Sequence, residues 1–140
     1  MYQRIMVPLD GSELAQTALT HALELCSALD ATLVLLHVRD LRQGSPEASR
    51  RFLDFTRRQQ GKSGVTIEIA IREGPVAEAI VRAAEEEQID MIAMATHGRS
   101  GLRRVVCGSV AEHVLHISSK PVLLVRVPGA PLAGPEQADS

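Results

Sequence analysis

The chain has 140 residues, of which 45% are hydrophobic and 23% charged, and its formal net charge is -2. This balance is typical of one globular domain with its own core, and the slight negative charge excludes a general electrostatic attraction to nucleic acid or anionic membranes. Aromatic residues make up only 2% and Trp is absent, which argues against base-stacking platforms for single-stranded nucleic acid.

The amino-terminal part reads as strand, helix, strand. It opens on the apolar run Arg4–Leu9, without a signal peptide or a membrane-spanning run, so we expect a cytoplasmic protein with no membrane partner. Pro8 is expected at the end of this strand, because a central strand cannot spare a backbone donor. Ser12 then caps a helix over Glu13–Leu29, and the apolar run Thr32–Val38 predicts a strand covered on both faces.

The middle of the chain adds two helices and two strands. The segment Pro46–Gln60 is predicted to be a polar, Arg-rich helix, and Val65–Ile71 alternates in the way an edge strand does. Gly74 and Pro75 open the next helix, since Pro favours the first helical position. The apolar run Asp90–Ala95 is the fourth predicted strand.

The carboxyl-terminal third begins with a predicted loop, Thr96–Cys107. A helix opened by Gly108 and Ser109 follows to residue 118, and Pro121–Val127 is the fifth predicted strand. Residues 128–140 contain three Pro and two Gly with almost no large apolar side chain, which predicts a disordered tail after a domain of residues 1–127.

The two cysteines do not make a disulfide framework. Cys26 falls on the apolar stripe of its helix, so we expect a buried thiol. Cys107 precedes the last predicted helix without a second Cys nearby, and no redox role is expected for it.

The alternation of apolar strands with helices predicts an α/β domain with a parallel sheet and helices on both faces. In such sheets the ligand crevice lies beyond the carboxyl ends of the strands, where the winding direction reverses. The loops after the first, second and fourth strands are therefore the places to look for chemistry.

The loop after the first strand contains Asp10, followed by Gly11 and Ser12. A carboxylate at this edge would accept hydrogen bonds from a sugar hydroxyl or hold a metal-bound water. The alternative is a plain turn, because Asp-Gly-Ser is common turn-and-cap chemistry.

The loop after the fourth strand is a candidate phosphate cradle. Gly98 would let backbone amides approach an anion, Arg99 would add charge, and Ser109 would add a hydroxyl at a helix start. Alternatively, Ser109 and Glu112 form a capping box without any ligand. The chain lacks a Walker P-loop, a dinucleotide fingerprint, a nucleophile elbow and a paired-Cys zinc motif, so no catalytic residue and no metal ligand set is predicted.

Three stretches resemble the universal stress protein family. They are IMVPLDGS at Ile5–Ser12, LLHV at Leu35–Val38, and the block Asp90–Arg126, which contains THGRSGL, GS and KPVLLV. The resemblance implies a five-stranded parallel sheet of order 3-2-1-4-5 in a Rossmann-like, adenine nucleotide alpha hydrolase-like fold. It also implies a homodimer through residues 121–127, an apolar edge that needs cover.

Members that bind ATP carry the motif G-x2-G-x9-G-[ST]. Gly98, Gly108 and Ser109 match its last three positions, whereas Ala95 stands at the first. A positive φ there would strain Ala95 by about 1 kcal/mol or more. The resemblance implies an ATP site, with Mg²⁺ or Mn²⁺ accompanying the phosphates, made by Pro8, Leu9, Asp10, Val38, Met94, Ala95, His97, Gly98, Arg99, Gly108, Ser109, Val110 and Ala111.

Three functions follow as hypotheses. The favoured one is a dimeric, ATP-binding regulatory module in stress response. The second is a nucleotide-free dimeric scaffold of the same family, which the alanine at position 95 would favour. The third is an ATPase, for which turnover is expected to be very slow because no residue stands out as a base for water.

Overall fold

A computed structural model describes residues 1–40, 42, 44–97 and 106–127, with the backbone alone for residues 97 and 106–108. The tail predicted for residues 128–140 lies outside these ranges. The elements in chain order are β1 (Arg4–Pro8), α1 (Glu13–Leu29), β2 (Thr32–Arg39), α2 (Pro46–Gln59), a short 3-10 helix (Gly61–Ser63), β3 (Ile67–Glu73), α3 (Val76–Glu86), β4 (Met91–His97), α4 (Val106–Ile117) and β5 (Val122–Val127).

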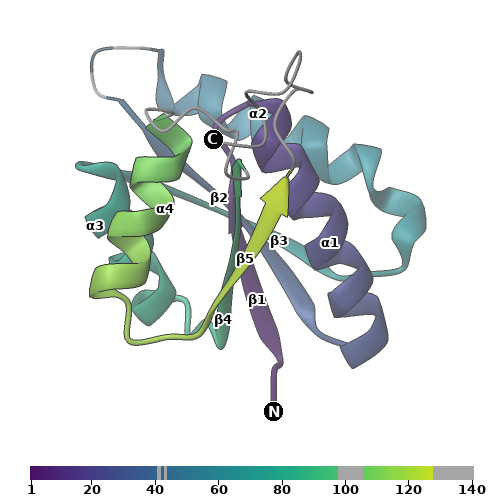
Figure 1. Cartoon of the computed structure of the whole chain (residues 1–140). Helices are drawn as coiled ribbons and strands as arrows, with labels where there is room; N and C mark the ends of the chain where they lie inside the picture. The colour runs from purple at the N-terminus through teal and green to yellow at the C-terminus, as the bar shows by residue number, and fades with distance from the viewer. Residues whose placement is uncertain (41, 43, 98–105, 128–140) are drawn as a thin grey trace, which may run out of the picture.

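The strands form one parallel sheet of order β3-β2-β1-β4-β5, which confirms the predicted fold class and strand order. Helices α1 and α2 cover one face, and α3 and α4 cover the other (Figure 1). None of the described helices is both long enough and apolar enough to cross a membrane. In the strand order, β1 lies between β2 and β4, so the direction in which successive strands are added to the sheet reverses at β1.

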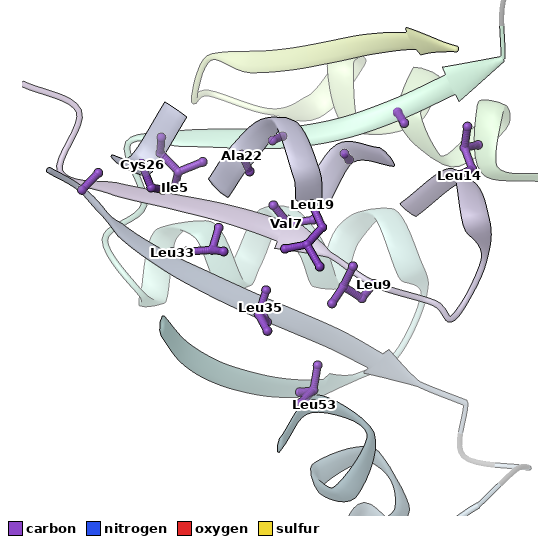
Figure 2. Packing of buried hydrophobic residues seen from close by; sticks show 14 residues of the cluster. Ile5, Val7, Leu9, Leu14, Leu19, Ala22, Cys26, Leu33, Leu35 and Leu53 are labelled. Carbon is purple, nitrogen blue, oxygen red and sulfur yellow. The ribbon is translucent and has the colours of Figure 1, made fainter. Parts of the chain in front are cut away.

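The core consists of two apolar layers, one on each face of the sheet. Ile5 and Val7 of β1 point to the α1 side, whereas Met6 points to the α3 and α4 side. Figure 2 shows the first layer, in which Leu19 of α1 packs above β1. Cys26 lies in the same layer with 1% exposure, and burial raises the pKa of its thiol to about 11, so the predicted buried thiol is confirmed.

Element boundaries differ from the sequence-based expectation where neighbouring strands decide them. The third strand was expected over Val65–Ile71 but covers Ile67–Glu73, because β2 offers partners through Arg39. The fourth strand was expected to end before a loop at Thr96, yet it continues to residue 97, since that residue pairs with β5.

The last helix was expected to open at Gly108 but begins two residues earlier, at Val106. Because Cys107 is the second residue of α4, it belongs to the helix and not to the predicted loop.

Strands β1 and β4 part after a short contact. They pair over only two positions, the last of them Met6 opposite Ile92, whereas β1 continues along β2 through Pro8. The carbonyl of Arg4 accepts a hydrogen bond from the amide of Asp90, so every second residue of β1 from Arg4 onward turns its backbone toward β4. Pro8 is one of these and has no N–H to donate. The expected place of Pro8 at the strand end is confirmed, and the sheet opens there.

Replacing Leu19 by Ala tests the core of the α1 face. Leu19 is 1% exposed, so we expect Leu19→Ala to lower the free energy of unfolding by about 2–5 kcal/mol in urea denaturation. Leu29→Ala, at a side chain with 43% exposure on the same helix, is the matched control and is expected to cost less than about 1 kcal/mol. Equal losses for the two variants would contradict this description of the core.

Candidate functional site

A hollow of about 170 Å³ lies at the carboxyl ends of the strands, where β1 and β4 part. It receives side chains from both faces of the sheet, since α1 and α3 each contribute to its wall. The lining residues are Pro8, Leu9, Asp10, Ser12, Leu14, Ala15, Ala18, Val38, Val76, Ile80, Met94, Ala95 and Val110.

The floor of the hollow is a hydrogen-bonded turn after β1. The Oδ1 atom of Asp10 accepts a hydrogen bond from the amide of Ser12 at 2.9 Å, and the Oγ atom of Ser12 accepts from the amide of Ala15 at 3.1 Å, which caps α1. Between them Gly11 has a φ of +88°, a conformation that a side chain would strain. The predicted turn is thus present, and Asp10 both builds it and lines the hollow.

The walls are mainly apolar. Val38 stands near the end of β2, Met94 and Ala95 come from β4, and Val110 comes from the second turn of α4. Over the described ranges, positive φ at residues other than glycine is confined to Asp30 and Gln88, so Ala95 carries no such strain. It is an ordinary strand residue opposite Val125.

The amino end of α4 differs from the capping-box expectation. Because the helix begins at Val106, Ser109 is its fourth residue and not its N-cap. The predicted capping box of Ser109 and Glu112 is therefore wrong. The amides of Val106, Cys107 and Gly108 fall in the first turn, where no intrahelical carbonyl is available to them. Gly108 adds no side chain to this turn.

A second hollow of about 460 Å³ lies beside the first, over the ends of β2 and β3. Val38 and Val76 line both hollows, so the two hollows are adjacent at the carboxyl ends of the strands. Its other lining residues include Arg39, whose guanidinium pairs with Glu73, and Asp40. The combined space exceeds that of the first hollow alone and runs from the β1–β4 gap toward β3.

The structure brings together seven of the thirteen predicted site residues around the first hollow, namely Pro8, Leu9, Asp10, Val38, Met94, Ala95 and Val110. Ser109 is exposed beside them on α4, whereas Ala111 is 1% exposed in the core beneath that helix. The backbone of His97 ends β4, and the backbone of Gly108 lies in the first turn of α4. Gly98 and Arg99 lie outside the described residues. The roles of all thirteen stay predictions.

Sequence reasoning did not assign Leu14, Ala15 and Ala18 of α1 or Val76 and Ile80 of α3 to the site. Most of them belong to the apolar stripes of their helices, so periodicity alone reads them as core contacts. The sequence did carry one signal, the small side chains of two alanines in the first turns of α1, because small side chains leave space beside the carboxyl ends of the strands. Across the described ranges, no group of three or more His, Cys, Asp or Glu residues is placed to hold a metal ion.

His37, near the carboxyl end of β2, connects the sheet to α2. Its Nδ1 atom lies 2.9 Å from the Oγ atom of Ser49, and its ring meets that of Phe52 edge-on at 5.5 Å. Burial lowers the pKa of His37 below its ordinary value of 6.5; the charge of Asp10 opposes this shift, and that of Arg39 adds to it. The neutral imidazole is therefore the form that holds α2 to β2.

Comparison with known proteins identifies the family of this chain. The profile of the universal stress protein family matches residues 1–126. Universal stress protein MJ0531 of Methanocaldococcus jannaschii is 33% identical over 91% of this chain and 84% of its own length. The solved structure of MJ0577 from that organism has a TM-score of 0.78 at 31% identity, covering 93% of this chain and 99% of the other. A universal stress protein solved in complex with cAMP has a TM-score of 0.73 at 26% identity, covering 89% and 96%.

The lowered pKa of His37 predicts a pH dependence of stability. The contribution of its neutral form is complete above pH 6.5 and is lost as the pH falls through that value toward the folded-state pKa, because the unfolded chain then binds the proton more readily. We expect the free energy of unfolding in urea to fall between about pH 7 and about pH 5. His37→Gln should reduce this slope, and His21→Gln, at an exposed site, should leave it unchanged. An unaltered slope in His37→Gln would contradict the assignment.

Proposed function

The chain belongs to the universal stress protein family, and from that membership we propose that it binds an adenine nucleotide, ATP above all, in the hollow where β1 and β4 part. The observation that carries the proposal is the position of this hollow, which lies at the reversal of winding and is lined by Val110, one turn into α4. Parallel sheets of this kind bind ligands at that point. The solved relative in complex with cAMP supports an adenine nucleotide as the ligand class.

The walls of the hollow suit a nucleoside. Val38, Met94 and Val110 offer apolar surface for a flat base, as small-molecule sites commonly do. Asp10 places a carboxylate at the same edge, where it would accept hydrogen bonds from ribose hydroxyls. The second hollow beyond Val38 and Val76 gives the base more room than the first provides by itself.

The amino end of α4 suits the phosphates. Its first-turn amides and the positive end of the helix dipole favour an anion. At Gly108 the helix has no Cβ to hold a phosphate away from the backbone. When bound, Mg²⁺ or Mn²⁺ would accompany the phosphates and neutralise part of their charge, and this chain's own contribution would be the amides and the Ser109 hydroxyl.

We further propose that the protein acts in the cytoplasm as a homodimeric regulatory module in stress response. β5 lies at the edge of the sheet, and Val122, Leu123, Leu124 and Val125 are each only half-buried. An apolar strand edge with open backbone groups is a template for pairing, and a second copy related by a two-fold axis covers it symmetrically. Nucleotide binding near β4 would then be next to the dimer contact, because β4 and β5 are neighbours.

Gly108→Val tests the placement of the phosphates. A side chain there would fill the space in which the amides meet the ligand, so we expect the affinity for MgATP in isothermal titration to fall at least about tenfold. The fold should persist, because Val is tolerated in a helix. Gly61→Val is the matched control, since a Cβ at that exposed position meets nothing within 4 Å, and it should bind like the original chain. Unchanged affinity in Gly108→Val would count against the site.

Arg126→Pro tests the dimer contact. The carbonyl of Pro121 accepts from the amide of Ile92 on β4, so Arg126, an odd number of residues away, turns its backbone to the free edge. Pro there removes an edge donor and leaves the bonds to β4 in place. In sedimentation velocity we expect a dimer for the original chain and for the control Arg126→Ala, and a monomer for Arg126→Pro. A monomeric original chain would refute the dimer.

A further inference from the structure

Helix α2 has an outer face that neither the core nor the nucleotide site uses. The helix turns Ser49, Leu53 and Thr56 into the core. At 100° per residue, Arg51, Phe55 and Arg58 fall on the opposite side, spaced one turn apart, and all three are exposed. We call these three residues the outer face of α2.

Among the described residues, Phe55 belongs to neither of the two core layers. The neighbouring aromatic residue, Phe52, lies against the ring of His37 and so helps to hold α2 to the sheet. Phe55 is 56% exposed and stands at the centre of the outer face, between the two arginines. Single exposed apolar side chains are common, but an aromatic ring flanked by guanidinium groups has the composition of an interface centre.

The charge of α2 also exceeds what the helix needs. It contains four arginines against two carboxylates, in a chain whose net charge is -2. Arg57 pairs with Asp54 at 2.7 Å, whereas Arg50, Arg51 and Arg58 form no ion pair with any described residue. Arg58 complements the carboxyl end of the helix dipole, but Arg51 lies in the amino-terminal half, where the dipole offers no benefit. Its charge is therefore available to a partner.

We propose that the outer face of α2 is a docking surface for an acidic segment of a partner protein. Carboxylates of that segment pair with Arg51 and Arg58, in the bidentate geometry that guanidinium groups favour. An apolar side chain of the segment covers the ring of Phe55, and Arg and aromatic residues of this kind contribute most to such interfaces.

Charge and size favour an acidic protein segment over other anionic partners. Nucleic acid is disfavoured, because the chain as a whole is negative and the face holds only two arginines about one ring. An anionic membrane is disfavoured as well, since each basic residue near the surface adds only about 1 kcal/mol and one ring inserts little apolar area. A short peptide matches a stripe of two helical turns, which is about 11 Å long.

The docking surface is separate from the other two sites. Helix α2 covers β2 and β3, whereas the proposed dimer contact lies on β5, at the opposite edge of the sheet. No residue of the outer face lines either hollow. A dimer paired through β5 would therefore present two copies of this surface, one at each end.

The test uses a synthetic fluorescein-labelled peptide in which two Leu residues stand between runs of Glu, with binding followed by anisotropy on the full chain. We expect saturable binding that weakens as salt is raised. Arg51→Glu should weaken it at least about tenfold and Phe55→Ala severalfold. Arg82→Glu, at an exposed position on α3, is the matched control and should bind within about twofold of the original chain. Affinity for MgATP and thermal stability should be unchanged in all three variants.

Several results would overturn the proposal. One is that the original chain does not bind the peptide. Another is that Arg82→Glu and Arg51→Glu lose the same affinity for it. Binding of polyuridylate or of phosphatidylserine vesicles through Arg51 and Phe55, in place of the peptide, would assign the surface to a different partner and likewise refute it. Because the variants keep the nucleotide site, failure here leaves the proposed nucleotide binding untouched.

Discussion

The site depends on a missing hydrogen-bond donor at Pro8. β1 is the central strand, and at this residue its backbone faces β4 without an N–H to offer. Pairing with β4 has already stopped at Met6, while β2 on the other side continues to support the strand. The gap that results is lined by apolar side chains from both faces of the sheet and lies beside the amino end of α4. A ladder that closed this gap would bring the same residues together without leaving space between them.

The same residues serve the fold and the proposed ligand. Asp10 holds the turn through the amide of Ser12, and Ser12 caps α1, so the carboxylate is fixed in place before any ligand arrives. This preorganisation lowers the entropy that binding costs. His37 extends the arrangement from the sheet edge to α2, whose outer face looks away from the site. One domain can thus carry a ligand pocket, a strand edge and a helix face that do not compete for surface.

Much of the fold could be predicted from the residues, and the exceptions have physical causes. Within the described ranges, alternating apolar runs and caps located all five strands and all four long helices. They do not encode which strands are neighbours, and the strand order came from the family resemblance. Boundaries moved where a neighbouring strand extended the ladder, as at Glu73 beside Arg39. Ser109 looked like a cap because Glu112 follows it, yet the helix starts earlier, at Val106. The alanines of α1 that line the first hollow could not be told from core residues, because helical periodicity indicates burial and not the space left beside a small side chain.

Whether the gap between β1 and β4 is a nucleotide receptor can be decided by a crystal structure grown with excess MgATP. We expect nucleotide density in the gap, with the base against Val38 and Met94, the ribose at Asp10 and the phosphates at the first turn of α4. A well-ordered crystal with the gap empty of nucleotide, or with the nucleotide bound elsewhere on the chain, would contradict it.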